Sequence, residues 1–148
     1  EPIVKSVVDD FNNIYKVKRG INISYKNDGK NKYLIYGIEN RIEQIIANLL
    51  DNAISFSDDN KDVIVQVSKS EDNKVYIKIL DEGQGFKEKD TNKIFKRFYS
   101  NRPDKFGQHS GLGLNIVKNL VDLHNATIKA TNRQDKKGAS MEIEFPKV

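Results

Sequence analysis

The segment from about Glu39 to Phe56 constrains the fold most, because its apolar side chains recur with helical spacing over several turns. The spacing i, i+3, i+4, i+7 is typical of an amphipathic helix. The polar run Ser57-Asp58-Asp59-Asn60 ends the pattern. Such a helix must bury its apolar stripe against another element, so the chain needs at least a second layer. The stripe consists of Ile42, Ile45, Ile46, Leu49, Leu50 and Ala53.

Two further segments show helical spacing. The first runs from Val4 to Tyr15, with Pro2 acceptable at a helix start and Gly20 as a break. The second resumes after Gly111. Its apolar stripe consists of Leu114, Val117, Leu120 and Val121.

The rest of the ordered pattern alternates with period two, as half-buried strands do. Turn signals separate these runs at 27–29, 71–73 and 134–138. Because hairpins predominate, we expect a two-layer α/β sandwich, an α+β fold with a mixed, mostly antiparallel sheet and the helices on one face. The expected strands are Ile21 to Tyr25, Tyr33 to Tyr36, Val63 to Val67, Val75 to Ile79, Ile128 with Ala130, and Met141 to Phe145.

Residues 1–148 are expected to form one domain. The polar stretch at about 87–111 lacks a clear period, and such an insert in a compact domain is usually a functional lid or a linker. The chain has no cysteine, which excludes disulfides and thiolate metal sites. No apolar run reaches the roughly 20 residues of a membrane helix. The start at Glu1-Pro2, without methionine, suggests an excised fragment.

The net charge of +4 admits an anionic ligand or a nucleic acid. The lysines are spread along the chain, and no signature of interleaved basic and aromatic residues is present. An ordinary solvated surface therefore explains the charge better, and no nucleic acid is expected as a partner.

Three groups of residues could bind a ligand, although each alone is also compatible with ordinary structure. Asn48, Asn52 and Ser55 share one stripe of the long helix, and an amide oxygen suits Mg²⁺. Asp81 follows an apolar strand and precedes Gly83 and Gly85. A carboxylate there can accept a hydrogen bond from an exocyclic amine such as that of adenine.

The third group is Ser110-Gly111-Leu112-Gly113-Leu114, which directly precedes a helix. Free N–H groups and the helix dipole favour a phosphate at such a place. The Gly-Lys-Ser/Thr of a Walker motif is absent.

Taken together and in order, these motifs resemble those of the ATP-binding catalytic domain of sensor histidine kinases. Asn48–Ala53 resembles the N box, and Asp81–Phe86 resembles the first glycine box. Ile94–Tyr99 is similar to the phenylalanine box, and Gly111–Leu114 to the second glycine box. Three stretches also resemble the ChvG-type sensors of alphaproteobacteria, namely Ser55–Ser57, Phe98–Pro103 and Ser110–Leu114.

The resemblance implies the Bergerat fold of the GHKL superfamily, with a five-stranded mixed sheet and three helices. It also implies that Asn52 is the Mg²⁺ ligand, with Asn48 near the phosphates, and that Asp81 reads the adenine amino group. Arg97 would contact the triphosphate from the lid. The other residues that the resemblance places at ATP are Ser55, Phe56, Gly83, Gly85, Phe86, Phe98, Lys105, Ser110, Gly111, Leu112, Gly113 and Leu114.

The implied reaction transfers the γ-phosphate of ATP to a histidine on a separate dimerisation domain of the same kinase. A cognate response regulator is the implied further partner. The fragment would be monomeric and its parent a homodimer, and the domain would lie in the cytoplasm below an inner-membrane sensor. His109 falls in the lid outside any phosphoacceptor motif, and His124 falls on an apolar stripe, where a packing or helix-end role is expected.

Three positions depart from the family pattern. Ser55 stands where many members have Lys or Arg, so a cationic phosphate contact is lost unless Arg97, Arg102 or Lys105 replaces it. Ala139 stands where Ser or Thr is common, and Asn125 where a glycine pair is usual.

Two other functions stay open. A degenerate, non-enzymatic nucleotide-binding module is compatible with Ser55 and Ala139. A self-contained GHKL ATPase is less compatible, because such enzymes carry a water-activating glutamate where this chain has Asn48. An amide is no general base at neutral pH, so little hydrolysis of ATP is expected from this chain alone.

Overall fold

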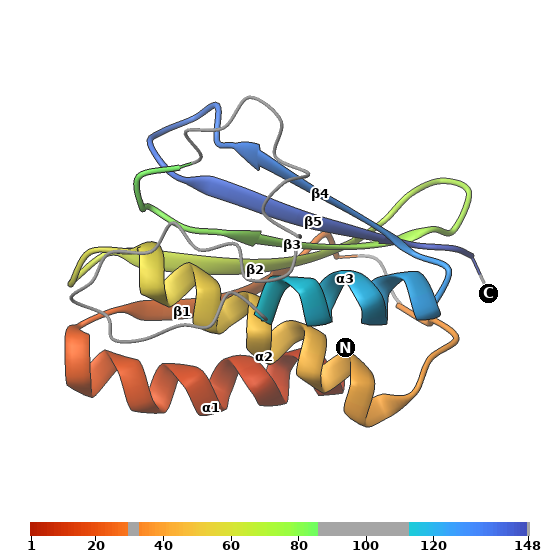
Figure 1. Ribbon diagram of the computed structural model, residues 1–148, viewed down its shortest axis with the longest axis horizontal. Helices are drawn as coiled ribbons and strands as arrows, with labels where there is room; N and C mark the ends of the chain where they lie inside the picture. The colour runs from red at the N-terminus through yellow and green to blue at the C-terminus, as the bar shows by residue number, and fades with distance from the viewer. Residues whose placement is uncertain (30–32, 86–112, 148) are drawn as a thin grey trace.

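The computed structural model describes residues 1–29, 33–85 and 113–147. Figure 1 shows two layers, a twisted sheet and three helices that cover one of its faces. The expected architecture is therefore confirmed. The elements in chain order are α1 (Pro2–Arg19), β1 (Asn22–Asn27), α2 (Glu39–Phe56), β2 (Asp62–Lys69), β3 (Val75–Leu80), α3 (Gly113–Leu123), β4 (Thr127–Asn132) and β5 (Ala139–Phe145).

The five strands are ordered β1-β2-β3-β5-β4. β1 pairs with β2 in parallel, because α2 carries the chain back between them, and the other pairs are antiparallel. The β2–β3 hairpin turns at Asn73, which adopts a left-handed conformation at φ 67. The last pair in the β3–β5 register is Leu80 with Ser140, so β3 ends where β5 begins, at one end of the sheet.

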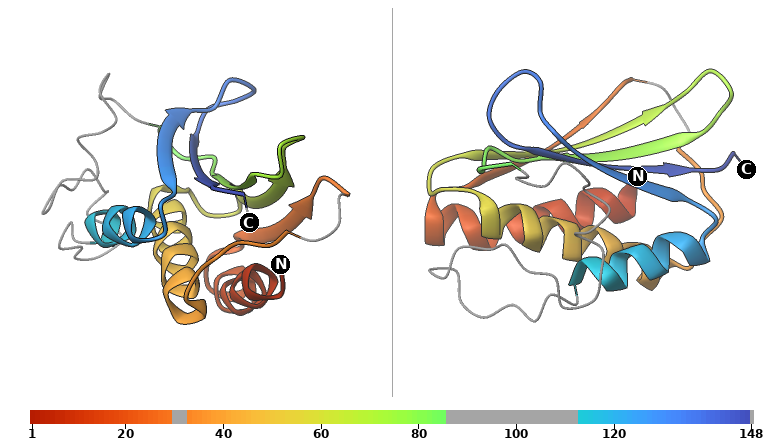
Figure 2. Two further views of the ribbon diagram at one scale, coloured as in Figure 1. Left: turned by 90° about the vertical axis from the view of Figure 1, so that its right-hand side faces the viewer. Right: turned by 45° about the horizontal axis from the view of Figure 1, so that its top comes forward.

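The core lies between the sheet and the helices, which the end-on view of Figure 2 separates clearly. The apolar stripe of α2 is buried over its whole length, and α2 packs against α1, α3 and β3. The alternating side chains of β2 and β3 supply the facing layer, with Val63, Val65 and Ile79 fully or almost fully buried. The helical period therefore predicted the bounds of α2 correctly.

Arg19, the last residue of α1, holds the C-terminal end of α2. Its guanidinium donates to the carbonyl of Ile54 at 2.7 Å, to that of Ser57 at 2.5 Å, and to the Asp59 carboxylate at 2.7 Å. The last turn of α2 carries no basic residue of its own. A cation is favourable beside the carbonyls of a helix end, so Arg19 of α1 provides from outside the positive charge that the last turn of α2 lacks.

The prediction of a strand from Tyr33 to Tyr36 is wrong. Residues 33–38 form no strand, although their side chains alternate as expected. Tyr33 and Ile35 pack against the core, whereas Leu34 and Tyr36 are exposed. An alternating pattern is typical of a strand, but a strand also needs a neighbouring strand to pair with. The strand that pairs with β1 in the sheet is β2.

The predicted lid at about 87–111 lies outside the described residues. Within the part of the chain that is described, no helix combines the length and the apolarity of a membrane span.

We predict that Arg19→Met lowers the free energy of unfolding by about 2 kcal/mol, because partly buried carbonyls lose a charged donor. Urea unfolding followed by circular dichroism measures this loss. Lys18→Met is the matched control, since Lys18 is exposed one position earlier in α1 and should cost almost nothing. Equal stability of the two variants would contradict a capping role for Arg19.

Candidate functional site

Three main-chain segments meet at the end of the sheet where β3 terminates. They are residues 81–85, the C-terminal end of α2, and the turn between β4 and β5, all on the left of Figure 1. Because β3 pairs with β5 up to this point, Asp81 comes to lie directly opposite Ala139.

The carboxylate of Asp81 is the central group of this site. The residue is only 4% exposed. Its Oδ1 accepts hydrogen bonds from the main-chain N–H groups of Gly83 at 2.9 Å and Ala139 at 3.0 Å. Among the described residues, both donors to this carboxylate use Oδ1, so Oδ2 retains its capacity to accept.

Burial raises the pKa of Asp81 above its ordinary value, because desolvation disfavours the charged form. The N–H groups of Gly83 and Ala139 oppose this rise, since they stabilise the carboxylate. A buried carboxylate of this kind lowers the stability of the fold at neutral pH, which is a common property of ligand-binding sites.

Two glycines are required here by close contacts within the protein. A Cβ on Gly83 would lie 2.4 Å from the carbonyl oxygen of Phe56, at the end of α2. A Cβ on Gly138 would lie 2.0 Å from the carbonyl oxygen of Asp81. The sequence predicted that the glycines after Asp81 leave room for a ligand. The structure shows that Gly83 leaves room for the C-terminal end of α2, whose Phe56 carbonyl lies beside it.

Gly85, the second glycine of the motif, has a left-handed φ of 79°. A Cβ there would lie 2.6 Å from Oδ1 of Asn132, at the end of β4. The positive φ disfavours a side chain at this position, and the Asn132 side chain would have to move to make room for one.

Glu82 fastens the loop to its neighbours. One carboxylate oxygen accepts the main-chain N–H of Asp62 at 2.8 Å, and the other accepts from the Lys136 ammonium at 3.0 Å. These contacts lower the pKa of Glu82, and the hydrogen bond from the Asp62 N–H is the largest single cause. The loop after β3 is thereby tied to the start of β2 and to the β4–β5 turn.

The predicted residues of α2 lie on the part of the helix that approaches this loop. Asn52 and Ser55 are 4% and 5% exposed, whereas Asn48 is half-buried. The Ser55 hydroxyl donates to the carbonyl of Asp51 at 2.8 Å, so it is engaged within its own helix. Phe56 is the last residue of α2, and its carbonyl contacts Gly83.

At the start of α3, Gly113 is the first helical residue and Leu114 is half-buried against the core. The remaining predicted site residues lie outside the described ranges. They are Phe86, Arg97, Phe98, Lys105, Ser110, Gly111 and Leu112.

Sequence reasoning missed Arg133. This residue follows β4, and its guanidinium donates to the carbonyl of Asp81 at 3.1 Å. No spacing rule links positions 81 and 133, so only the pairing of β3, β5 and β4 brings them together.

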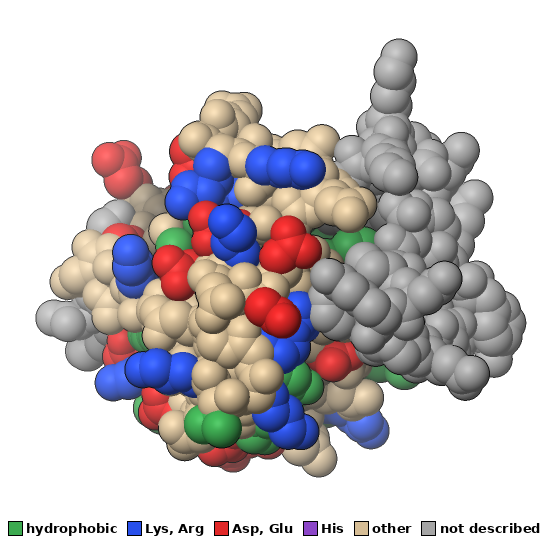
Figure 3. Space-filling model, turned by 90° about the vertical axis from the view of Figure 1, so that its left-hand side faces the viewer, with side chains coloured by type: hydrophobic (Ala, Val, Ile, Leu, Met, Phe, Trp, Pro, Cys, Tyr) green, Lys and Arg blue, Asp and Glu red, His purple; other side chains and the backbone are tan. Residues whose placement is uncertain are grey.

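Figure 3 shows this end of the molecule, with Lys, Arg, Asp and Glu interspersed over its described part. This agrees with the expectation of an ordinary solvated surface. The described residues contain no group of three or more His, Cys, Asp or Glu side chains able to hold a metal ion.

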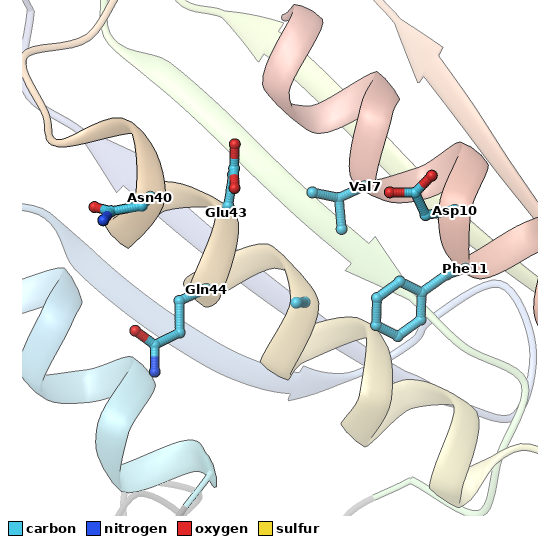
Figure 4. Close-up of a pocket in the computed structure, with 7 residues that line it drawn as sticks. Val7, Asp10, Phe11, Asn40, Glu43 and Gln44 are labelled. Carbon is cyan, nitrogen blue, oxygen red and sulfur yellow. The ribbon is translucent and has the colours of Figure 1, made fainter.

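A separate hollow of about 340 Å³ opens between α1 and α2. In Figure 4, Val7 and Phe11 extend from α1 toward α2. The lining contains none of the predicted site residues, so this hollow is distinct from the Asp81 site. It is lined by Val7, Asp10, Phe11, Asn40, Glu43, Gln44 and Ala47.

We predict that Gly83→Ala lowers the free energy of unfolding by about 1–3 kcal/mol, because a methyl group would overlap the Phe56 carbonyl. Thermal or urea unfolding measures the loss. Gly113→Ala is the control, since a Cβ there meets no described atom within 4 Å. If both substitutions are neutral, α2 and the loop after β3 are not in close contact.

Sequence comparison places residues 37–148 in the family described as histidine kinase-, DNA gyrase B-, and HSP90-like ATPases. The sensor protein ChvG of Agrobacterium fabrum is 35% identical over 143 residues, covering 92% of this chain and 24% of the relative. ChvG of Rhizobium meliloti is 36% identical over 119 residues, covering 78% and 20%. The chain thus spans about a quarter or less of the length of these relatives.

Solved structures agree with this result. The catalytic domain of the histidine kinase ThkA superimposes with a TM-score of 0.83 at 25% identity, covering 99% of this chain and 91% of that domain. Full-length ShkA in complex with AMPPNP has the same fold, with a TM-score of 0.82 at 23% identity, covering 98% of this chain and 29% of ShkA. Family membership explains the N box on α2, the glycine box after β3 and the order of the sheet together. The chain belongs to the family of histidine kinase-, DNA gyrase B- and HSP90-like ATPases.

Proposed function

We propose that this chain is the ATP-binding catalytic domain of a two-component sensor kinase, which transfers the γ-phosphate of ATP to a histidine on a separate dimerisation domain. The observation that carries the proposal is the Asp81 carboxylate, buried at the end of β3 with Oδ1 occupied by two N–H groups. Family membership and the similarity to ChvG support it.

Asp81 is suited to recognise an amine donor. Two main-chain N–H groups orient the carboxylate through Oδ1, which leaves Oδ2 to accept from the ligand. A site built to accept a hydrogen bond discriminates strongly against bases that lack the donor, because its buried polar group would then be unpaired. The adenine amino group fits this requirement.

Asn52 and Asn48 are proposed for the metal and phosphate end of the nucleotide. The amide oxygen of Asn52 is a hard ligand on a nearly buried stripe of α2. Mg²⁺ takes few protein ligands and completes its shell with phosphates and water, which fits a described region without a carboxylate cluster. The bound ion would neutralise phosphate charge during transfer.

The loss of a cation at Ser55 has to be made good elsewhere, because the Ser55 hydroxyl already donates to Asp51. We propose Arg97 and Lys105 of the predicted lid for this role, with Gly111 and Gly113 providing main-chain N–H groups to the phosphates at the start of α3. Phe56, Gly83, Gly85, Phe86, Phe98, Ser110, Leu112 and Leu114 complete the proposed nucleotide site.

The alternative of a degenerate binding module depends partly on Ala139. The contact of Ala139 with Asp81 is made by its main-chain N–H, so it does not need a Ser or Thr side chain. This observation favours a functional nucleotide site.

We propose that the accepting histidine comes from another domain. His124 is 8% exposed, its Nδ1 lies 2.7 Å from the Leu120 carbonyl, and its Nε2 accepts the N–H of Ile38. Both ring nitrogens are therefore occupied at the end of α3, as the packing role predicted. We propose the dimerisation domain of the same kinase and a response regulator as partners, in a homodimeric, membrane-anchored parent whose catalytic domain is cytoplasmic.

We predict that Asp81→Asn weakens ATP binding by about 10- to 100-fold, the value of a hydrogen bond to a charged group. The same change should keep or raise the free energy of unfolding at pH 7, because the amide oxygen can still accept both N–H groups and no charge is buried. Calorimetric titration with ATP and Mg²⁺ and urea unfolding measure the two effects. Asp122→Asn, at an exposed site of α3, should change neither.

We further predict that the chain alone hydrolyses ATP negligibly, since Asn48 cannot activate water. Mixed with the histidine-bearing domain of its parent and γ-labelled ATP, it should transfer label to that histidine, and Asp81→Asn should abolish transfer. Steady hydrolysis by the chain alone that is lost in Asp81→Asn would instead support an independent ATPase. Tight ATP binding without transfer would support the degenerate module.

A further inference from the structure

Arg133 joins the β4–β5 turn to the end of β3. Its main-chain N–H donates to the Gly138 carbonyl at 2.9 Å, which closes the turn. Its guanidinium reaches across and donates through Nη1 to the carbonyl of Asp81 at 3.1 Å. Nε and Nη2 donate to the two carboxylate oxygens of Asp135 at 3.0 and 2.8 Å.

The burial of this guanidinium needs an explanation. The Arg133 side chain is 5% exposed, although the Asp135 side chain that pairs with it is 65% exposed. A surface ion pair alone gains little and does not require burial. Fixing and desolvating an arginine is costly unless its donors are used, and the contact that draws it inward is the one with Asp81.

Gly138 provides the space for this contact. A Cβ at Gly138, where φ is 147°, would lie 2.0 Å from the Asp81 carbonyl oxygen and 3.1 Å from Cδ of Arg133. The carbonyl therefore occupies the position that any other residue would fill with its side chain. The turn, the guanidinium and the end of β3 fit together only with glycine at this position.

Arg133 also places a positive charge near the Asp81 carboxylate. Of the charged neighbours, Arg133 favours the ionised form of Asp81, whereas Glu82 disfavours it. Glu82 is itself paired with Lys136, and Arg133 with Asp135. The last turn of α2 and the first two residues of β5, Ala139 and Ser140, carry no charge.

We propose that Arg133 is the positioning residue of the nucleotide site: it fixes the main chain at Asp81 and holds a positive charge beside the carboxylate that accepts from the base. The inference rests on the proposed function for its ligand. Its geometric part concerns only residues of this chain.

The proposal gives a defined pH dependence. Protonation of the Asp81 carboxylate weakens it as an acceptor and turns one of its oxygens into a donor, so ATP affinity should fall as the pH drops through its raised pKa. Without Arg133 the pKa of Asp81 rises further, and affinity is lost at a higher pH. Neutralising Glu82 removes its repulsion of the Asp81 carboxylate, so the pKa of Asp81 falls and ATP affinity is lost at a lower pH.

We would therefore compare Arg133→Gln, Arg133→Lys and Glu82→Gln with the unmodified protein. Carboxyl ¹³C NMR follows the titration of Asp81 without nucleotide, and calorimetry gives ATP affinity from neutral pH down to the acid limit of the fold. We expect the midpoint to move up in Arg133→Gln and down in Glu82→Gln. Arg133→Lys should keep the titration midpoint of Asp81 unchanged, because the positive charge is retained. It should keep only part of the ATP affinity, because an ammonium lacks the several guanidinium N–H groups that donate to both Asp81 and Asp135.

Equal weakening of ATP binding by Arg133→Gln at every pH, with an unchanged Asp81 midpoint, would show a purely structural role and overturn the proposal. If Arg133→Gln does not fold, the other two variants decide. The proposal is overturned if the titration midpoint of Asp81 moves in Arg133→Lys, or if it does not move in Glu82→Gln. If the unmodified protein binds no ATP, the proposed function fails, and the titration of Asp81 without nucleotide still decides the role of Arg133.

Discussion

A carboxylate buried at the end of β3 needs hydrogen-bond donors from its surroundings, and the local structure follows from that requirement. Oδ1 of Asp81 needs two donors, and they come from the loop after β3 and from the first residue of β5. Both donors reach it only because the chain passes closely at Gly83 and Gly138. The packing of α2 onto the loop and the shape of the β4–β5 turn are thus tied to one side chain.

The same end of the molecule is held from outside by two arginines. Arg19 caps α2 from α1, and Arg133 holds the end of β3 from the β4–β5 turn. Each guanidinium donates to main-chain carbonyls across more than thirty residues of sequence. Both fix main-chain segments at the end of the sheet where the nucleotide site is proposed.

The sequence predicted α2 with its approximate bounds and a strand at each of the five places where the sheet has one, because burial of one face imposes a period that can be read directly. It failed at Tyr33 to Tyr36, where the alternation reflects packing over the core without a strand to pair with. Asp81 and Gly83 were identified through their motif. Arg19 and Arg133 could not be, since their partners are distant in sequence and nothing distinguishes them from the other 23 basic residues, 25 Lys and Arg less these two.

The contacts around Asp81 are made largely by main-chain atoms, and this has an evolutionary consequence. Position 139 can change its side chain without losing the N–H that it donates, and the residue at 81 receives Arg133 on its carbonyl. Positions 83 and 138, by contrast, have no room for a single methyl group. At these positions, the size of a new side chain therefore decides whether a substitution is tolerated more than its chemical groups do.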